Sequence, residues 1–352
     1  MLKLLFISTP VGSLGSGIGG GVELTLKNLA IEMNRRGHQV TVLAPESSIL
    51  PNIDLIQIAG QCQQMAQAER RRNSIALLHN SVLGNMWDYA RTIQYNYDII
   101  TNFAYDWLPF YLTPFFKRPI AHLVSMSSIN PAFDQIITQV AQNFPKTIGV
   151  HSKIQAETFP FAASCRILGN GLDLSLYQCC LDPGESLGWV GRIAPEKGLE
   201  DAVAAAQITG IPLKIFGKME DKSYWQQISQ DYPHAPVDYQ GFLSTFELQE
   251  QLGRCRALLM TPRWVEAFGN VVMEALACGV PIIAYRRGGP AEMVREGETG
   301  FLVEPDNITA LVANIERIDT ISRHRCRQQA EQEYSLNAFG DRFEKWFIEL
   351  KK

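Results

Sequence analysis

The segment spanning residues 261–305 constrains the fold of this chain more than any other part of the sequence. Glu266 and Glu274 stand eight positions apart within it. One apolar run precedes them at 257–260 and another follows at 280–285, which predicts a strand, a loop carrying Glu266, a helix carrying Glu274, and a second strand. Open α/β sheets bind ligands where the carboxyl ends of their strands meet. The pattern therefore places two carboxylates at a candidate ligand site.

The rest of the chain repeats this alternation of strands and helices in two halves. An apolar content of 46% in 352 residues is enough to fill two hydrophobic cores. The alternation predicts parallel sheets covered by helices, joined by a turn-rich linker at 169–186. A last helix at 336–351 carries aromatic residues on one face, which it must bury. Strands are expected at 2–8, 38–43, 97–102, 120–124, 186–190, 212–216, 238–242 and 258–260, and helices at 22–36, 81–96 and from 199.

Composition excludes several classes of protein. A net charge of −4 and a pI near 5.9 disfavour nucleic-acid binding. No run approaches the roughly 18 apolar residues of a membrane span, and the N-terminus lacks a signal-peptide pattern. Seven scattered cysteines without a CxxC pair indicate a reduced, cytoplasmic compartment. A membrane partner is not expected, although the arginines at 70–72 leave contact with anionic lipid as an alternative.

A glycine-rich loop at 10–23 follows the first predicted strand. Gly15, Gly17 and Gly20 spell G-x-G-x-x-G, so an NAD-dependent oxidoreductase is a rival interpretation. In that fingerprint, however, the first glycine turns directly off the strand, whereas here six residues intervene. The remaining inference is that Gly20 or Gly21 lets the backbone approach a phosphate at a helix N-terminus. A flexible surface loop is the alternative.

Two cations lie in the loop after the first strand of the second half, where Gly191-Arg192 and Lys197-Gly198 occur. A diphosphate is well matched by the fork of an arginine and the compact charge of a lysine. The alternative is a solvated loop with ordinary surface charges.

The glutamate segment adds further candidate contacts. Glu266 could accept hydrogen bonds from sugar hydroxyls, and Glu274 could accept them from a ribose. The backbone of Phe268, Gly269 and Asn270 would meet a phosphate at the start of the helix. A capping glutamate followed by an exposed helical one is the alternative.

These motifs together resemble the retaining GT-B glycosyltransferases of glycosyltransferase family four. The resemblance also rests on GGGVELTLKNLA with RRGHQV, on the Asn170-Gly171-Leu172-Asp173 turn, and on GRIAPEKG. It implies two facing Rossmann-like parallel-sheet domains with a C-terminal crossover helix. The expected acceptor-binding domain spans 1–169 with 330–352, and the nucleotide-sugar domain spans 170–329.

The resemblance also assigns roles to residues. Arg192 and Lys197 would bind the diphosphate and offset charge on the leaving nucleotide, and Glu266 would hold the sugar, which makes these three the catalytic set. Glu274 would bind the ribose. The backbone of 268–270 would contribute to the same donor site, and Gly20 or Gly21 would approach the phosphate from the other domain.

One position departs from the family pattern. Where members commonly carry a histidine near the transferred sugar, this chain has Ser125, while His122 lies three residues earlier on a predicted strand. His122 is read as a core histidine or as a residue behind the site, and Ser125 as the candidate substitute. Transfer on one face of the sugar, with the leaving diphosphate helping to deprotonate the acceptor, would need no metal and no cofactor.

The acceptor is the least constrained part of the function. The N-terminal run is similar to enzymes of cyanobacteria that transfer glucose from UDP-glucose to tetrahydrobiopterin, a reduced pterin. A pterin edge offers adjacent N–H donors to a carboxylate and a flat ring to aromatic side chains. Asp106, among aromatic residues, is the first candidate for that contact and Asp88 the second. A lipid or polysaccharide acceptor, and a non-catalytic sensor of nucleotide sugars, remain alternatives.

Overall fold

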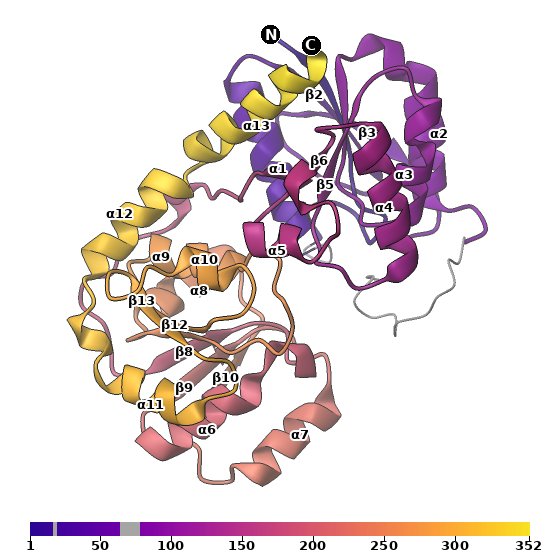
Figure 1. Ribbon diagram of the computed structural model, residues 1–352. Coiled ribbons are helices and arrows are strands. Elements are labelled where there is room, and N and C mark those ends of the chain that lie inside the picture. Colours follow the sequence, from indigo (N-terminus) through magenta and orange to yellow (C-terminus); the bar gives the residue numbers. More distant parts are fainter. Residues whose placement is uncertain (17–19, 64–77) are drawn as a thin grey trace. The chain divides into compact units, whose positions relative to one another are not determined.

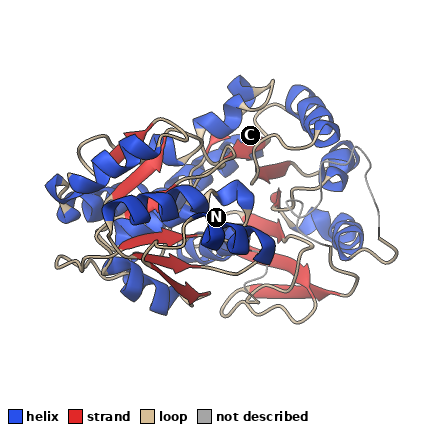
Figure 2. Ribbon diagram, turned by 90° about the horizontal axis from the view of Figure 1, so that it is seen from below, coloured by secondary structure: helices blue, strands red, loops and turns tan. Residues whose placement is uncertain are grey.

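A computed structural model describes residues 1–16, 20–63 and 78–352 of the chain. The chain divides into two compact units, Met1–Gly171 with Leu336–Lys352, and Leu172–Ser335. In each unit the strands form one parallel sheet with helices packed alongside them (Figures 1 and 2). The predicted α/β class is confirmed.

The first unit contains a seven-stranded sheet in the order β3-β2-β1-β4-β5-β6-β7. Its strands are β1 (Lys3–Ile7), β2 (Gln39–Pro45), β3 (Asp54–Ile58), β4 (Ile99–Asn102), β5 (Ile120–Val124), β6 (Ile148–Val150) and β7 (Arg166–Ile167). Its helices are α1 (Gly20–Arg35), α2 (Val82–Ile93), α3 (Trp107–Leu112), α4 (Pro131–Asn143), α5 (Lys153–Glu157) and α13 (Leu336–Lys351). The strand order reverses between β1 and β4, which is the crevice of a doubly wound sheet.

The second unit repeats this topology with six strands in the order β10-β9-β8-β11-β12-β13. Its strands are β8 (Leu187–Val190), β9 (Leu213–Phe216), β10 (Val237–Gly241), β11 (Leu258–Met260), β12 (Ile282–Tyr285) and β13 (Gly300–Val303). Its helices are α6 (Leu199–Thr209), α7 (Lys222–Asp231), α8 (Thr245–Gly253), α9 (Asn270–Ala277), α10 (Pro290–Met293), α11 (Ile308–Glu316) and α12 (Arg323–Glu333). Here the order reverses between β8 and β11.

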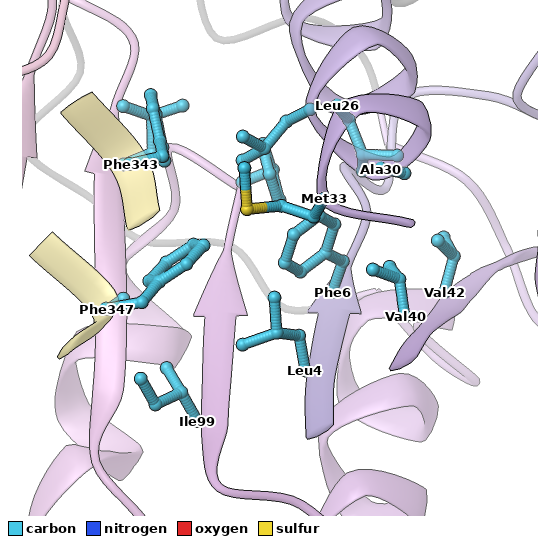
Figure 3. Close-up of a cluster of buried hydrophobic side chains, with 14 of the residues drawn as sticks. Leu4, Phe6, Leu26, Ala30, Met33, Val40, Val42, Ile99, Phe343 and Phe347 are labelled. Atoms are coloured by element: carbon cyan, nitrogen blue, oxygen red, sulfur yellow. The ribbon is translucent and has the colours of Figure 1, made fainter. Parts of the chain in front are cut away.

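Alternation along the central strand β1 builds the core of the first unit. Leu4 and Phe6 point to one face and belong to the cluster formed with α1 and α13, which Figure 3 shows with Met33 and Phe347. Leu5 and the other alternate residues point to the opposite face and pack against α2. Because both faces are covered, the strand is a continuous apolar run.

The C-terminal helix α13 returns to the first unit, as predicted, and packs against α1. Glu32 of α1 is fully buried at this junction, and Arg35 and Arg36 each pair with it at 2.7 Å. Arg36 also reaches Glu344 of α13 at 2.8 Å. Burial alone would raise the pKa of Glu32, but the hydrogen bonds from the two arginines hold it below its usual value.

The chain leaves the first unit after Gly171 and returns to it after Ser335. Asn170 donates to the hydroxyl of Thr25 at 2.8 Å and so ends the first unit against α1. Two residues later the backbone N–H of Leu172 donates to the carbonyl of Tyr334 at 2.7 Å. The predicted linker therefore begins with anchored residues.

Four strands were not predicted: β3, β6, β7 and β13. β3 is a partly exposed strand at one edge of its sheet, and β7 has only two residues, so neither carries a strong apolar pattern. β6 contains Gly149, where a Cβ would lie 2.4 Å from Cδ1 of Leu168 and 2.9 Å from the ring of Trp346. These two side chains, one of them about 200 residues away, leave no room for a Cβ, and the local pattern cannot reveal such contacts.

We expect Glu32→Gln to lower the free energy of unfolding by about 2–3 kcal/mol, because two arginines lose their shared carboxylate at a buried junction. Urea denaturation measures the change. The matched control is Glu349→Gln on α13, whose partner Arg166 is 37% exposed. Loss of this ion pair should lower the free energy of unfolding by less than about 1 kcal/mol. Equal effects of the two substitutions would contradict the role given to Glu32.

Candidate active site

The predicted donor residues lie on two loops at the switch point of the second sheet. One loop follows β8 and carries Arg192 and Lys197, and the other follows β11 and carries Glu266. β8 and β11 are neighbouring strands whose following helices depart in opposite directions, so their loops border the same crevice.

Glycines allow these loops to approach closely. Gly198 has φ +64°, and a Cβ there would lie 1.9 Å from the carbonyl oxygen of Thr261. The hydroxyl of Thr261 in turn donates to the carbonyl of Gly198 at 2.7 Å. Gly288, in the loop after β12, has φ +72°, and its Cβ would lie 2.5 Å from the backbone of Glu266. A larger residue at either glycine would push the loops apart.

Lys197 and Glu266 form an ion pair across the two loops. The Nζ of Lys197 lies 2.5 Å from Oε2 of Glu266, and the indole N–H of Trp264 donates to the same oxygen at 3.0 Å. The ammonium group also lies 5.0 Å from the centre of the Trp264 ring. The side chains of Lys197 and Glu266 are 20% and 16% exposed, so the pair is held firmly yet remains accessible.

Arg192 pairs with different carboxylates. Its guanidinium group contacts Glu196 at 2.7 Å and Glu220 at 2.5 Å. In this state its charge is already compensated. An anionic ligand would therefore displace these glutamates from Arg192. Until it binds, the two ion pairs keep the guanidinium group ordered.

The start of α9 has the features of an anion site. Gly269 caps the helix with φ +100°, and Asn270 is its first residue. Phe268 is 8% exposed and packs edge-on against Tyr334, with 6.1 Å between ring centres. Its side chain is thus engaged in packing, and its backbone is the part suited to a ligand at the helix N-terminus.

Glu274 follows in the second turn of α9. The hydroxyl of Tyr177, a linker residue that sequence reasoning did not single out, donates to its Oε1 at 3.2 Å. Part of the glutamate reaches the surface, but burial of its carboxyl group raises the pKa to about 7, opposed by this hydrogen bond. A ribose with two hydroxyl donors would compensate the ionised form.

A network behind the site was also not predicted. Arg263 joins Glu200, Asp201 and Asp306 at 2.8, 2.7 and 2.5 Å, and the Tyr285 hydroxyl donates to Asp201 at 2.5 Å. These residues tie the β11 loop to α6, β12 and the loop after β13. The sequence does not indicate which residues pair with a charged side chain in a loop, so these partners are identified only from the fold.

The first unit holds the predicted acceptor residues in separate environments. Asp106 caps α3 by accepting from the backbone N–H of Leu108 at 3.0 Å. Asp88 is exposed on α2 and pairs with Arg91 at 2.8 Å. Ser125 directly follows β5 and is partly exposed.

His122 is fully buried in β5. Its Nδ1 lies 3.3 Å from Asn102 and its Nε2 2.9 Å from Thr113, while its ring stacks on Phe110 at 4.4 Å. Burial lowers its pKa to about 3, so it is neutral at physiological pH. In this structure His122 packs in the core, and Ser125 rather than His122 is partly exposed.

Gly20 begins α1 with φ +58°, and Gly21 is the next residue. A Cβ at Gly20 would meet nothing within 4 Å, so backbone conformation rather than crowding explains this glycine. Gly17 and the arginines at 70–72 lie outside the described residues.

Among residues 1–16, 20–63 and 78–352, no three or more histidine, cysteine, aspartate or glutamate side chains are grouped in a way that could hold a metal ion. Across the same part of the chain, no helix combines the length and apolarity needed to cross a membrane.

We expect stability to fall as pH rises toward and through 7, and Glu274→Gln to remove much of that fall. The pKa of Glu274 rises from an ordinary 4.5 to about 7 on folding, so between these values the folded chain holds a proton that the unfolded chain releases. Its stabilising contribution is complete below about 4.5 and is lost as pH passes 7. The effect is on the order of 1–3 kcal/mol, measurable by urea denaturation between pH 5 and 8. Glu316→Gln, at an exposed position, should keep the wild-type profile.

Two family models match the two halves of the chain. Residues 19–175 match the model described as Glycosyltransferase Family 4, and residues 184–333 match the one described as Glycosyl transferases group 1. Together they span most of the sequence. They replace the oxidoreductase interpretation of the first glycine loop.

Curated relatives are similar over part of their length. The capsular polysaccharide biosynthesis glycosyltransferase CapM of Staphylococcus aureus is 25% identical over 195 residues, 49% of this chain and 48% of the relative. A glycogen synthase of Mycobacterium tuberculosis is 30% identical over 188 residues, 49% of this chain and 44% of the relative. The chain thus spans about half the length of the curated relatives it matches.

Solved structures share the fold over nearly the whole chain. Anabaena HepE in complex with UDP-glucose has a TM-score of 0.78 at 18% identity, covering 99% of this chain and 100% of that one. Sucrose-phosphate synthase from Thermosynechococcus elongatus has a TM-score of 0.81 at 18% identity, with 99% of each chain covered. At this identity the likeness establishes the fold alone. With the GT-B fold and both family models in place, the chain belongs to the glycosyltransferases of group 1 and family 4.

Proposed function

We propose that the chain transfers glucose from UDP-glucose to a small acceptor, with retention of configuration, and that this acceptor is tetrahydrobiopterin, at a side-chain hydroxyl. The observation that carries the proposal is the Lys197–Glu266 pair at the switch point of the second sheet. A diphosphate joined to a sugar needs a cation for its phosphates and a carboxylate for its sugar hydroxyls, and the pair at this edge supplies both.

Arg192 and Lys197 hold the diphosphate together with the N-terminus of α9. Both cations are compensated by glutamates before the ligand arrives, so binding exchanges one anion for another without exposing a bare charge. Lys197 then shifts toward phosphate, and Glu266 becomes available to the sugar hydroxyls. Glu274 accepts from the ribose.

No side chain is needed to remove the proton from the acceptor hydroxyl. The bond between C1 of the sugar and the diphosphate oxygen breaks, and a new bond forms from the acceptor oxygen to C1 on the same face. The acceptor proton passes to the departing diphosphate, whose negative charge Arg192 and Lys197 stabilise. Both cations therefore act most strongly on the leaving group.

The named neighbours support the choice of donor. HepE was solved with UDP-glucose, and the relatives include a glycogen synthase, whose name denotes a polymer of glucose. A pterin acceptor is supported by the resemblance of the N-terminal run and by the aromatic residues around Asp106. Trp107 and Tyr111 there are stacked, with 4.5 Å between ring centres.

A polysaccharide or lipid-linked acceptor is the second candidate. The name of the relative CapM, which refers to capsular polysaccharide biosynthesis, favours it. UDP release from UDP-glucose, measured against a panel of reduced pterins, oligosaccharides and lipid-linked sugars, separates the two. Binding to vesicles of anionic lipid gives an independent measure of a membrane acceptor.

We expect Glu266→Gln to lower kcat at least 100-fold, because the carboxylate that accepts from the sugar hydroxyls becomes an amide. The Kd for UDP should change less than about threefold, since UDP lacks the glucosyl group whose hydroxyls Glu266 accepts from. UDP release gives kcat, and quenching of tryptophan fluorescence gives Kd.

The matched control for this substitution is Glu298→Gln, at an exposed position of the same unit, which should leave both quantities unchanged. Near-normal turnover in Glu266→Gln would overturn the site assignment. A large loss of UDP affinity with normal turnover at saturation would show that Glu266 acts on the nucleotide instead.

A further inference from the structure

Trp264 contacts both members of the ion pair on which the proposed function rests. Its indole N–H donates to Oε2 of Glu266 at 3.0 Å, and the Nζ of Lys197 lies 5.0 Å from the centre of its ring. Lys197 donates to the same oxygen of Glu266. The carboxylate is therefore held through one oxygen by two different donors.

The backbone around Trp264 is fixed on both sides. The N–H of Arg263 donates to the carbonyl of Glu196 at 2.9 Å, which ties the residue before Trp264 to the β8 loop. The N–H of Gly289 donates to the carbonyl of Glu266 at 2.7 Å, which ties the β11 loop to the loop after β12. The indole and the carboxylate thus stand on a short segment with little freedom to move.

The second oxygen of Glu266 is available to a ligand. No group in the described part of the chain donates to Oε1, and the residue is partly exposed. An ionised carboxylate can accept hydrogen bonds on both of its oxygens. Oε2 is therefore the oxygen through which the protein orients the group, and Oε1 is the one left for a sugar hydroxyl.

The two donors to Oε2 respond differently when a diphosphate arrives. Lys197 carries a full charge on a flexible stem, so the phosphates attract it away from Glu266. The indole of Trp264 is neutral and rigid, so a phosphate attracts it much less. Its hydrogen bond to an ionised carboxylate is also stronger than one between neutral groups. Trp264 therefore keeps its contact with Oε2 after the lysine has moved.

We propose that Trp264 is a positioning residue, whose indole N–H holds Oε2 of Glu266 while Lys197 binds the diphosphate. Oε1 then keeps the orientation in which it accepts from the sugar. Without the N–H the carboxylate would rotate, and the sugar would lose its alignment rather than the nucleotide its affinity. The inference rests on the proposed function, in which Glu266 binds the sugar of the donor.

Two substitutions separate the N–H of Trp264 from its ring. Trp264→Phe keeps a ring and loses the N–H, whereas Trp264→Gln loses the ring and keeps an N–H at the same number of bonds from Cα. We expect Trp264→Phe to lower kcat for UDP release from UDP-glucose at least tenfold, and Trp264→Gln to keep kcat within about threefold of wild type. Calorimetry should give a Kd for UDP within about twofold of wild type in both variants.

The matched control is Trp225→Phe, at a partly exposed tryptophan of α7, which should behave as wild type. Near-normal kcat in Trp264→Phe would overturn the inference. Equal losses in Trp264→Phe and Trp264→Gln would overturn it as well, because they would assign the effect to the ring.

A double substitution distinguishes positioning from a general structural role. If the indole acts through the carboxylate, adding Trp264→Phe to Glu266→Gln should lower kcat by less than about twofold further. A full tenfold loss in that background would show that Trp264 acts independently of Glu266, and would overturn the inference.

The indole N–H resonance of Trp264 gives a measurement that needs no turnover. In proton–nitrogen correlation NMR it is the indole signal that Trp264→Phe removes. We expect it to stay at its hydrogen-bonded position when UDP is added to saturation, and to move upfield in Glu266→Gln. An upfield move on adding UDP to the wild-type chain would overturn the inference. A chain that binds UDP and keeps this signal but releases no UDP from UDP-glucose would contradict the proposed glucose transfer, while confirming that the indole retains Oε2.

Discussion

The close approach of three loops at the switch point of the second sheet is the constraint on which the candidate site depends. The loops after β8, β11 and β12 pass one another at distances that admit no Cβ at Gly198 or Gly288. Each glycine loses more backbone entropy on folding than another residue would. Hydrogen bonds between the loops, such as that from Thr261 to Gly198, offset part of this cost. Without this approach Lys197 and Glu266 would not meet.

Charge compensation is the second theme of the site. Lys197 and Arg192 have glutamate partners before any anion binds, and Arg263 behind them is surrounded by three carboxylates. Opposite charges arranged in this way keep long side chains ordered, which lowers the entropic cost when a ligand replaces one partner.

Most of the fold could be predicted because its determinants are local. The strand at 120–124 and the helix at 336–351 have the predicted bounds, since an apolar run or a helical stripe of aromatics marks each one. The strands that were missed are short or exposed, or contain a glycine crowded by side chains from other segments, as Gly149 is by Leu168 and Trp346. Local patterns carry no information about such contacts.

The sequence alone determined that two doubly wound halves follow one another and that cations and glutamates recur at the carboxyl ends of the second set of strands. Only the tertiary structure decided which groups share a charge or a proton. It paired Lys197 with Glu266 and gave Glu274 a partner in Tyr177. It also buried His122. Spacing along the chain reports secondary structure, whereas these roles depend on side chains 69 or 97 positions apart meeting at short distances in places shielded from water.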